Sequence, residues 1–207
     1  VDAEGDPTGG APRPVGANNA VTAVFEPGSV NKVITMTAAL EEGVVTPETW
    51  LTVPDSLQVA DHTFRDHNPH PTAQWRPTDI MATSSNVGTI LLGQRLGAER
   101  LDSYLRRFGF GEETALGFPG ESGGLLLDVD DWSGTSIGSI PLGQGVAVTA
   151  LQMLGAYNTI ANDGVLVAPR IVDATVDGEG VRHDTARSAT RRVVSAETAR
   201  TVRDMLV

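Results

Sequence analysis

A serine and a lysine stand three positions apart at the start of a segment that is otherwise almost free of charge. Ser29 and Lys32 open the run SVNKVITMTAALEE (residues 29–42), in which apolar residues recur at helical spacing and which Gly43 terminates. A helix places the two side chains on one face, about 5–6 Å apart at Cβ. A poorly hydrated lysine loses proton affinity, so its neutral amine can take the proton of a neighbouring hydroxyl. The pair therefore indicates a serine nucleophile for acyl transfer.

Lys32 is the only lysine of the chain, and the other 14 basic residues are arginines. It is also the only charged residue between Val30 and Leu40, which predicts a largely buried helix whose lysine is either costly or functional. The free N–H groups and the dipole at the helix start favour a developing negative charge next to Ser29. The alternative interpretation is that Ser29 is an ordinary helix cap and Lys32 an ordinary helical residue.

A second polar cluster, Ser84-Ser85-Asn86, lies between two predicted helices over residues 78–84 and 87–96. In an extended turn the side chains of Ser84 and Asn86 point the same way. A hydroxyl and a carboxamide held together there can relay a proton and bind a substrate amide. The simpler interpretation is that Ser84 or Ser85 caps the second helix and that Asn86 occupies its first turn.

The composition restricts the classes of function. The 207 residues carry 15 basic and 26 acidic side chains, a formal charge of −11, which argues against a nucleic-acid binder. The chain has no cysteine, so a thiol nucleophile, a disulfide and a zinc–thiolate site are excluded. No apolar run approaches the roughly 20 residues of a membrane span. The histidines and aspartates of DHTFRDHNPH (residues 61–70) could hold a divalent metal, but the prolines favour an exposed loop.

The elements that must position these residues are mainly helices. Residues 20–25 are typical of a short strand, whereas 50–77 is loop-rich and 109–145 is Gly-rich and irregular. We predict further helices over 98–108 and 149–162, strands over 170–176 and 192–194, and a last helix capped by Ser195. Both ends look cut, because residues 1–19 are typical of a loop and the last helical pattern runs to Val207 without a stop signal.

Together the two clusters resemble the Ser-x-x-Lys and Ser-x-Asn motifs of the penicillin-binding proteins. The likeness is to the transpeptidase domain of class B enzymes, within them to the division-specific type of actinobacteria, and runs from about residue 20 to residue 207. Five stretches carry it in the right order: FEPGSVNKVITM, SSNVGTILLGQRLG, GFPGESGGLL, IPLGQGVAVTALQM and NDGVLVAPRI. The resemblance implies an α+β fold, a five-stranded, mainly antiparallel sheet with helices on both faces, of which this chain holds the helical lobe and few strands.

The resemblance also implies roles for single residues. Ser29 would attack the carbonyl of the penultimate D-alanine of a peptidoglycan stem peptide, or the ring of a β-lactam antibiotic, and Lys32 would activate it. Ser84 would pass a proton to the leaving group, while Asn86 would bridge Lys32 and the substrate amide. The backbone N–H of Ser29 would supply half of the oxyanion hole. Contacts to substrate are expected from two further residues, Gly28 and Ser85.

One motif of the family is missing, since a Lys-Thr-Gly sequence needs a second lysine. In the family this motif stands on an inner strand that follows a segment similar to residues 191–207. We therefore expect residues 1–207 to form a partial transpeptidase domain that is inactive alone. Its expected partners are the remainder of the domain, stem peptides, β-lactams and membrane proteins of the division complex. We expect no cofactor, no metal and no nucleic acid, and a location on the extracytoplasmic face of the membrane, with an N-terminal anchor outside this sequence.

Two other functions share part of this chemistry. A serine β-lactamase has the same serine and lysine but also needs a base for a deacylating water, usually in a Glu-x-x-Leu-Asn loop, and no such string follows Asn86. A non-catalytic β-lactam sensor or division scaffold would form the same acyl adduct as a transpeptidase. Turnover of a cephalosporin would favour the β-lactamase, and loss of cell-wall cross-linking on depletion would favour the transpeptidase over the sensor.

Overall fold

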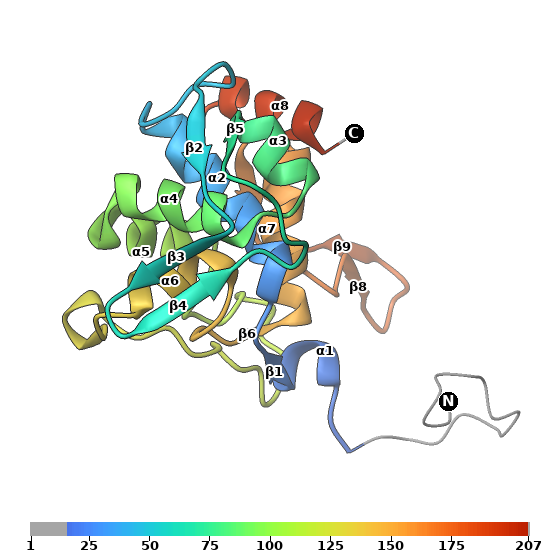
Figure 1. The fold of residues 1–207 in the computed structure, drawn as a ribbon. Coiled ribbons are helices and arrows are strands. Elements are labelled where there is room, and N and C mark those ends of the chain that lie inside the picture. The colour runs from blue at the N-terminus through green and yellow to red at the C-terminus, as the bar shows by residue number, and fades with distance from the viewer. Residues whose placement is uncertain (1–15, 207) are drawn as a thin grey trace, which may run out of the picture.

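The computed structural model describes residues 16–206, in which helices outweigh strands (Figure 1). The α-helices are α1 (Asn19–Thr22), α2 (Lys32–Glu41), α3 (Pro77–Ala82), α4 (Asn86–Leu96), α5 (Ala98–Arg107), α6 (Ser136–Ser139), α7 (Ala150–Ala161) and α8 (Ala196–Met205). Short 3-10 helices are η1 (Gly28–Asn31), η2 (Val129–Asp131) and η3 (Ile140–Leu142). Each helix in this part of the chain is too short or too polar to cross a bilayer.

The strands of the described residues pair into small antiparallel sheets of two strands each. The pairs are β1 (Val24–Phe25) with β6 (Val148–Thr149), β2 (Leu51–Val53) with β5 (Ala73–Trp75), β3 (Ser56–Val59) with β4 (His62–Arg65), β7 (Val165–Val167) with β10 (Thr190–Arg192), and β8 (Ala174–Val176) with β9 (Arg182–Asp184). This arrangement confirms the predicted α+β class and its well-developed helical part, but the described strands form separate two-stranded pairs rather than part of one five-stranded sheet. β1 pairs only with β6 among these residues, which leaves Val24 and Phe25 at an open edge and nearly half exposed.

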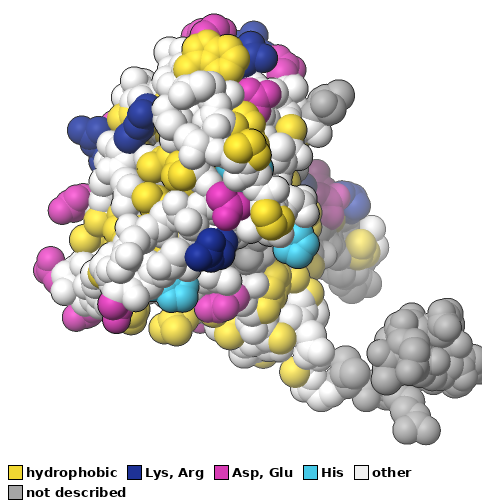
Figure 2. All heavy atoms as spheres, in the orientation of Figure 1, with side chains coloured by type: hydrophobic (Ala, Val, Ile, Leu, Met, Phe, Trp, Pro, Cys, Tyr) yellow, Lys and Arg dark blue, Asp and Glu magenta, His cyan; other side chains and the backbone are white. Residues whose placement is uncertain are grey.

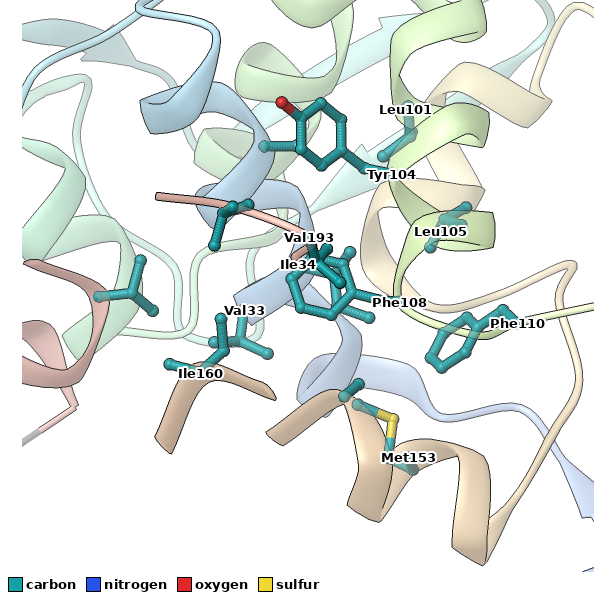
Figure 3. Close-up of a cluster of buried hydrophobic side chains, with 14 of the residues drawn as sticks. Val33, Ile34, Leu101, Tyr104, Leu105, Phe108, Phe110, Met153, Ile160 and Val193 are labelled. Carbon is teal, nitrogen blue, oxygen red and sulfur yellow. The ribbon is translucent and has the colours of Figure 1, made fainter. Parts of the chain in front are cut away.

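Helix α2 lies at the centre of the helical part and is buried on all sides. Every residue from Lys32 to Ala39 is buried, because α4, α5 and α8 pack around the helix. Figure 3 shows Val33 of α2 beside Ile160 of α7, and Ile34 beside Phe108 and Val193. Full burial of an aliphatic side chain such as Ile34 contributes about 1.5–3 kcal/mol. The packing that holds α2 therefore also holds the residues at its N-terminus in place.

The predicted helices are confirmed in position and type, but their first turns differ. The segment 29–42 begins as the 3-10 helix η1 before α2, and Gly43 follows it with a positive φ of 64°. Ser195 caps α8 as predicted, its Oγ accepting from the N–H of Thr198. Most of the predicted N-terminal loop, residues 1–15, lies outside the described residues, and so does Val207.

The strand predictions are partly wrong. The region 50–77 was expected to be loop-rich but contains β2 to β5, which are only three or four residues long, and only β2 alternates between buried and exposed positions. In residues 20–25 the strand is only β1, because α1 is capped by Asn18 and occupies the first positions. The strand predicted over 170–176 is restricted to β8, and the one over 192–194 is shifted to β10.

Acidic and basic side chains are interspersed on the face shown in Figure 2. Dark-blue arginines stand among magenta carboxylates there rather than in a stripe. This distribution agrees with the acidic charge balance of the whole chain and offers no basic footprint on that face for a nucleic acid.

Candidate active site

Ser29 lies in η1, between the edge strand β1 and the buried helix α2, and is exposed. Its turn is held against the loop that follows η3. The N–H of Gly28 donates to the carbonyl oxygen of Gly143 at 2.9 Å, and Gly143 adopts a φ of +80°. A Cβ on Gly143 would lie 2.4 Å from the carbonyl oxygen of Gly28, a distance that no side chain tolerates. The backbone approach that fixes the turn of Ser29 therefore requires glycine at position 143.

The amine of Lys32 is enclosed by polar atoms of the turn before α4. Its Nζ lies 2.5 Å from the carbonyl oxygen of Ser84, 2.7 Å from Oδ1 of Asn86 and 3.2 Å from Oγ of Ser84. The residue is only 2% exposed. Burial lowers the pKa of Lys32 from 10.5 to about 8, although the negative charge of Asp66 opposes the shift. A substantial fraction of the amine is therefore neutral at mildly alkaline pH.

The neutral amine has a defined orientation in this cage. The carbonyl oxygen of Ser84 and Oδ1 of Asn86 can only accept, so they take the two N–H groups of the amine. The hydroxyl of Ser84 is the third polar group within reach of the amine, at 3.2 Å. The amine of Lys32 therefore contacts Ser84 and Asn86, and no hydrogen bond joins it to Ser29 among the described residues.

The turn that presents Ser84 is strained. Ser84 has a φ of +52°, a conformation that costs a residue with a side chain about 1 kcal/mol or more. Asn86 is the first residue of α4, and its Nδ2 donates to the carbonyl oxygen of Arg65 at the end of β4, at 2.8 Å. With Oδ1 on Lys32 and Nδ2 on Arg65, the carboxamide of Asn86 links α2, α4 and β4. Such strain at a cluster of polar groups is common at functional sites.

A polar pocket of about 540 Å³ joins these groups. Four of the six predicted site residues line it, namely Gly28, Ser29, Ser84 and Asn86. Lys32 lies beside it, in contact with Ser84 and Asn86. Ser85 is not a lining residue: it is 2% exposed, and its hydroxyl caps α4 and donates to Asp66 at 2.7 Å. The interpretation of Ser85 as the helix cap fits this geometry, and the expected substrate contact does not.

The opposite wall of the pocket was missed by the sequence analysis. It consists of β4 and the residues after it, including His62, Arg65, His67 and Asn68. These residues fall in the segment that was considered for metal binding.

Within residues 16–206 no group of three or more His, Asp or Glu side chains could hold a metal ion, and His70 instead pairs with Asp66. The alternation of SLQV and HTFR around Ala60 and Asp61 was the available signal for this hairpin.

The lowered pKa of Lys32 makes stability depend on pH. Between pH 8 and 10.5 the unfolded chain binds a proton that the folded chain does not, so the free energy of unfolding rises with pH in that range. Between pH 7.5 and 9.5 we expect the free energy of unfolding of wild type to rise by on the order of 1–2 kcal/mol more than that of Lys32→Met. Urea denaturation at both pH values measures this gain. The range stops at 9.5 because burial raises the pKa of Tyr104 to about 12, which lowers stability above pH 10. Equal pH dependence in both proteins would show that the amine is hydrated.

The fold and the pocket place the chain in the transpeptidase family of the penicillin-binding proteins. The family described as "Penicillin binding protein transpeptidase domain" matches residues 3–207, so the chain belongs to this family, as the sequence analysis predicted. The penicillin-binding protein PbpB of Mycobacterium tuberculosis is 48% identical over 189 residues, which are 91% of this chain and 28% of that protein. The probable peptidoglycan D,D-transpeptidase PenA of Neisseria flavescens is 32% identical over 92% of this chain and 44% of its own length.

Solved structures agree with this assignment. Penicillin-binding protein 3 of Mycobacterium tuberculosis in complex with aztreonam superposes with a TM-score of 0.89 at 48% identity, over 92% of this chain and 42% of that one. The transpeptidase domain of penicillin-binding protein 3 of Burkholderia pseudomallei superposes with a TM-score of 0.80 at 28% identity, over 91% of this chain and 54% of that one. The chain thus spans less than a third of the PbpB relative and about half or less of these solved chains.

Proposed function

We propose that this chain carries the acyl-serine centre of a D,D-transpeptidase that cross-links peptidoglycan stem peptides and that β-lactams acylate. The observation that carries the proposal is the dehydrated amine of Lys32, held between Ser84 and Asn86 at a pocket that Ser29 lines. A buried amine with a pKa of about 8 is a suitable base for a hydroxyl. The naming of the Neisseria flavescens relative as a probable peptidoglycan D,D-transpeptidase supports the substrate class.

The proposed reaction assigns a step to each of the polar side chains at the pocket. Oγ of Ser29 attacks the carbonyl carbon of the penultimate D-alanine while its proton passes to the amine of Lys32. The tetrahedral intermediate collapses, the C–N bond breaks, and the terminal D-alanine leaves after Ser84 delivers a proton to its nitrogen and takes the proton of Lys32 in return. The amine of a second stem peptide then attacks the acyl-Ser29 ester and forms the cross-link. The C–O bond of the ester breaks, and the proton that the attacking amine loses returns to Oγ of Ser29.

The start of η1 suits the negative charge that develops in this reaction. Gly28 uses its N–H on Gly143, whereas the N–H of Ser29 finds no acceptor outside the helices among residues 16–206. A free N–H at a helix start is a suitable donor to an oxyanion. The nucleophile and one oxyanion donor then belong to the same residue.

Acylation of Ser29 tests the proposal. We expect benzylpenicillin to add to the protein with its full mass, because opening of the lactam ring releases no leaving group, and we expect Ser29→Ala to form no adduct. Intact-protein mass spectrometry measures the adduct, and Ser103→Ala, at an exposed position of α5, is the matched control that should still react. An adduct that persists in Ser29→Ala would refute the assignment. Rapid hydrolysis of the adduct would indicate a β-lactamase instead.

We further propose that residues 1–207 provide the nucleophile, base and relay of a larger transpeptidase domain, because the sequence has no second lysine for a Lys-Thr-Gly motif. On this proposal, the adduct at Ser29 forms more slowly in this chain than in a longer protein that contains that motif. Equal rates would contradict it. We also propose an extracytoplasmic, membrane-anchored location and contacts with division proteins, since stem peptides are cross-linked outside the membrane. Depletion of the protein from cells should then reduce septal cross-linking, whereas a sensor would leave it unchanged.

A further inference from the structure

A buried carboxylate contacts the turn that carries Ser84 and Asn86. The side chain of Asp66, the first residue after β4, is only 5% exposed. Its Oδ1 accepts from the backbone N–H of Val87 at 2.9 Å, and its Oδ2 accepts from the hydroxyl of Ser85 at 2.7 Å. The Ser85 hydroxyl accepts from the N–H of Gly88, so its own hydrogen is directed at Asp66. Asp66 thereby fixes the residues on either side of Asn86 to the end of β4.

His70 contacts the same carboxylate. Its Nδ1 lies 2.8 Å from the carbonyl oxygen of Pro71, and its Nε2 lies 2.9 Å from Oδ2 of Asp66. A carbonyl oxygen can only accept, so Nδ1 carries a hydrogen. Oδ2 already accepts from Ser85, and a carboxylate can only accept, so Nε2 must carry a hydrogen as well. The contacts of both ring nitrogens therefore describe a doubly protonated imidazolium that is paired with Asp66.

We propose that Asp66 and His70 form a buried ion pair that positions the Ser84–Asn86 turn and sets the electrostatic field at the amine of Lys32. Both are positioning residues, since they act on the reaction through Ser85, Asn86 and Lys32. The consequence for the reaction rests on the proposed function, whereas the effect on the charge of Lys32 does not. The sequence analysis placed both residues in a segment that could hold a divalent metal but that its prolines favoured as an exposed loop.

The charges of Asp66 and His70 have opposite effects on the pKa of Lys32. The negative charge of Asp66 raises the pKa of Lys32 against the larger effect of burial. The positive charge of His70 compensates Asp66, and the carbonyl of Pro71 together with Asp66 raises the pKa of His70, although desolvation opposes this. A neutral residue at 66 should therefore make Lys32 easier to deprotonate, and a neutral residue at 70 should make it harder.

Other charged groups also face the pair and are part of its balance. Asp55, on the turn between β2 and β3, accepts from the backbone N–H of His70 at 3.1 Å and pairs with Arg65 at 3.6 Å. The ring of His70 packs against Trp75 of β5, with 4.5 Å between the ring centroids. His62 and His67 line the pocket on the same side. These groups stay constant when only Asp66 or His70 is replaced.

The single lysine of the chain makes the test direct. In protein labelled with ¹³C at lysine Cε, one signal reports the protonation of Lys32. We expect a wild-type midpoint near pH 8. Asp66→Asn keeps an acceptor for Val87 and should lower the midpoint by roughly half a pH unit or more, and His70→Gln keeps a donor to Asp66 and should raise it by a similar amount. The acidic limb of the acylation rate profile should move in the same two directions.

The matched control is the exposed pair of His183 and Asp177 on the β8–β9 hairpin, whose side chains lie 2.7 Å apart. This hairpin extends away from the helices in Figure 1, so His183→Gln and Asp177→Asn should leave the lysine midpoint unchanged. Asp66→Glu retains the charge and should keep the midpoint near that of wild type. If Asp66→Asn does not fold, His70→Gln decides alone, because its side chain is the more exposed of the two.

The outcomes separate this inference from the proposed function. Unchanged midpoints, or midpoints that move in the same direction in both variants, overturn the role of the ion pair even if Ser29 is acylated. Opposite shifts in a protein that no β-lactam acylates would support the ion pair and refute the proposed function. A wild-type midpoint near 10.5 would overturn both, since the amine would then be hydrated.

Discussion

Replacement of Lys32 by methionine is expected to slow acylation of Ser29 by about 10²- to 10⁴-fold, the usual contribution of a positioned general base. Methionine has nearly the volume of lysine and fits the buried position at the start of α2, so the loss should appear in the rate rather than in the fold. Stopped-flow measurement with a fluorescent penicillin gives the rate constant, and circular dichroism checks the helices.

The pH profile distinguishes a base from a structural residue. If the amine is the base, the wild-type rate rises with pH through the pKa of Lys32, about 8, and the residual rate of Lys32→Met lacks this limb. Lys32→Arg keeps a positive charge but cannot deprotonate near neutral pH, so it should be as slow as Lys32→Met. A fast Lys32→Arg variant would mean that only the charge matters and that another group takes the proton.

The sequence was sufficient for the longer helices and for the polar residues Ser29, Ser84 and Asn86 that line the pocket, because their signals are local. Gly43 and Ser195 mark helix ends, and the isolated Lys32 in an apolar run predicted a buried amine, which the structure confirms. The contact between Lys32 and Asn86 is not local, since it spans 54 positions and depends on how α2 packs against α4. Only the family resemblance, and not spacing, joined these two residues in advance.

The elements that the sequence analysis missed have weak local signals. β2 to β5 are short, and their partners fix them more than their own composition does. Asp66 and His70 stand in a segment whose prolines indicated a loop, and the structure shows that these two side chains are largely buried near the start of α4. A buried Asp–His pair cannot be distinguished from an exposed metal loop by residue types alone, because both use the same side chains.

Replacement of Gly143 by alanine is expected to damage both stability and acylation. Its φ of +80° costs an alanine about 1–2 kcal/mol, and the new Cβ would also lie 2.4 Å from the carbonyl oxygen of Gly28 and 2.7 Å from Cβ of Asn31. Those atoms belong to the backbone of Gly28 at the start of η1 and to the buried Asn31 at its end, so they cannot move aside without displacing Ser29 between them. We expect a loss of roughly 3 kcal/mol or more in the free energy of unfolding, together with slower acylation of the folded fraction.

Gly145 is the matched control because it has the same backbone strain without the close approach. Its φ is +76°, and an added Cβ would find its nearest neighbour, Oγ of Ser139, at 3.6 Å. Gly145→Ala should therefore lose only the cost of the positive φ, about 1–2 kcal/mol, and retain the acylation rate of wild type. Urea denaturation and the penicillin assay separate the two variants. If Gly143→Ala behaved like Gly145→Ala in both measurements, the loop after η3 would not be what holds the nucleophile, and the position of Ser29 would depend on α2 alone.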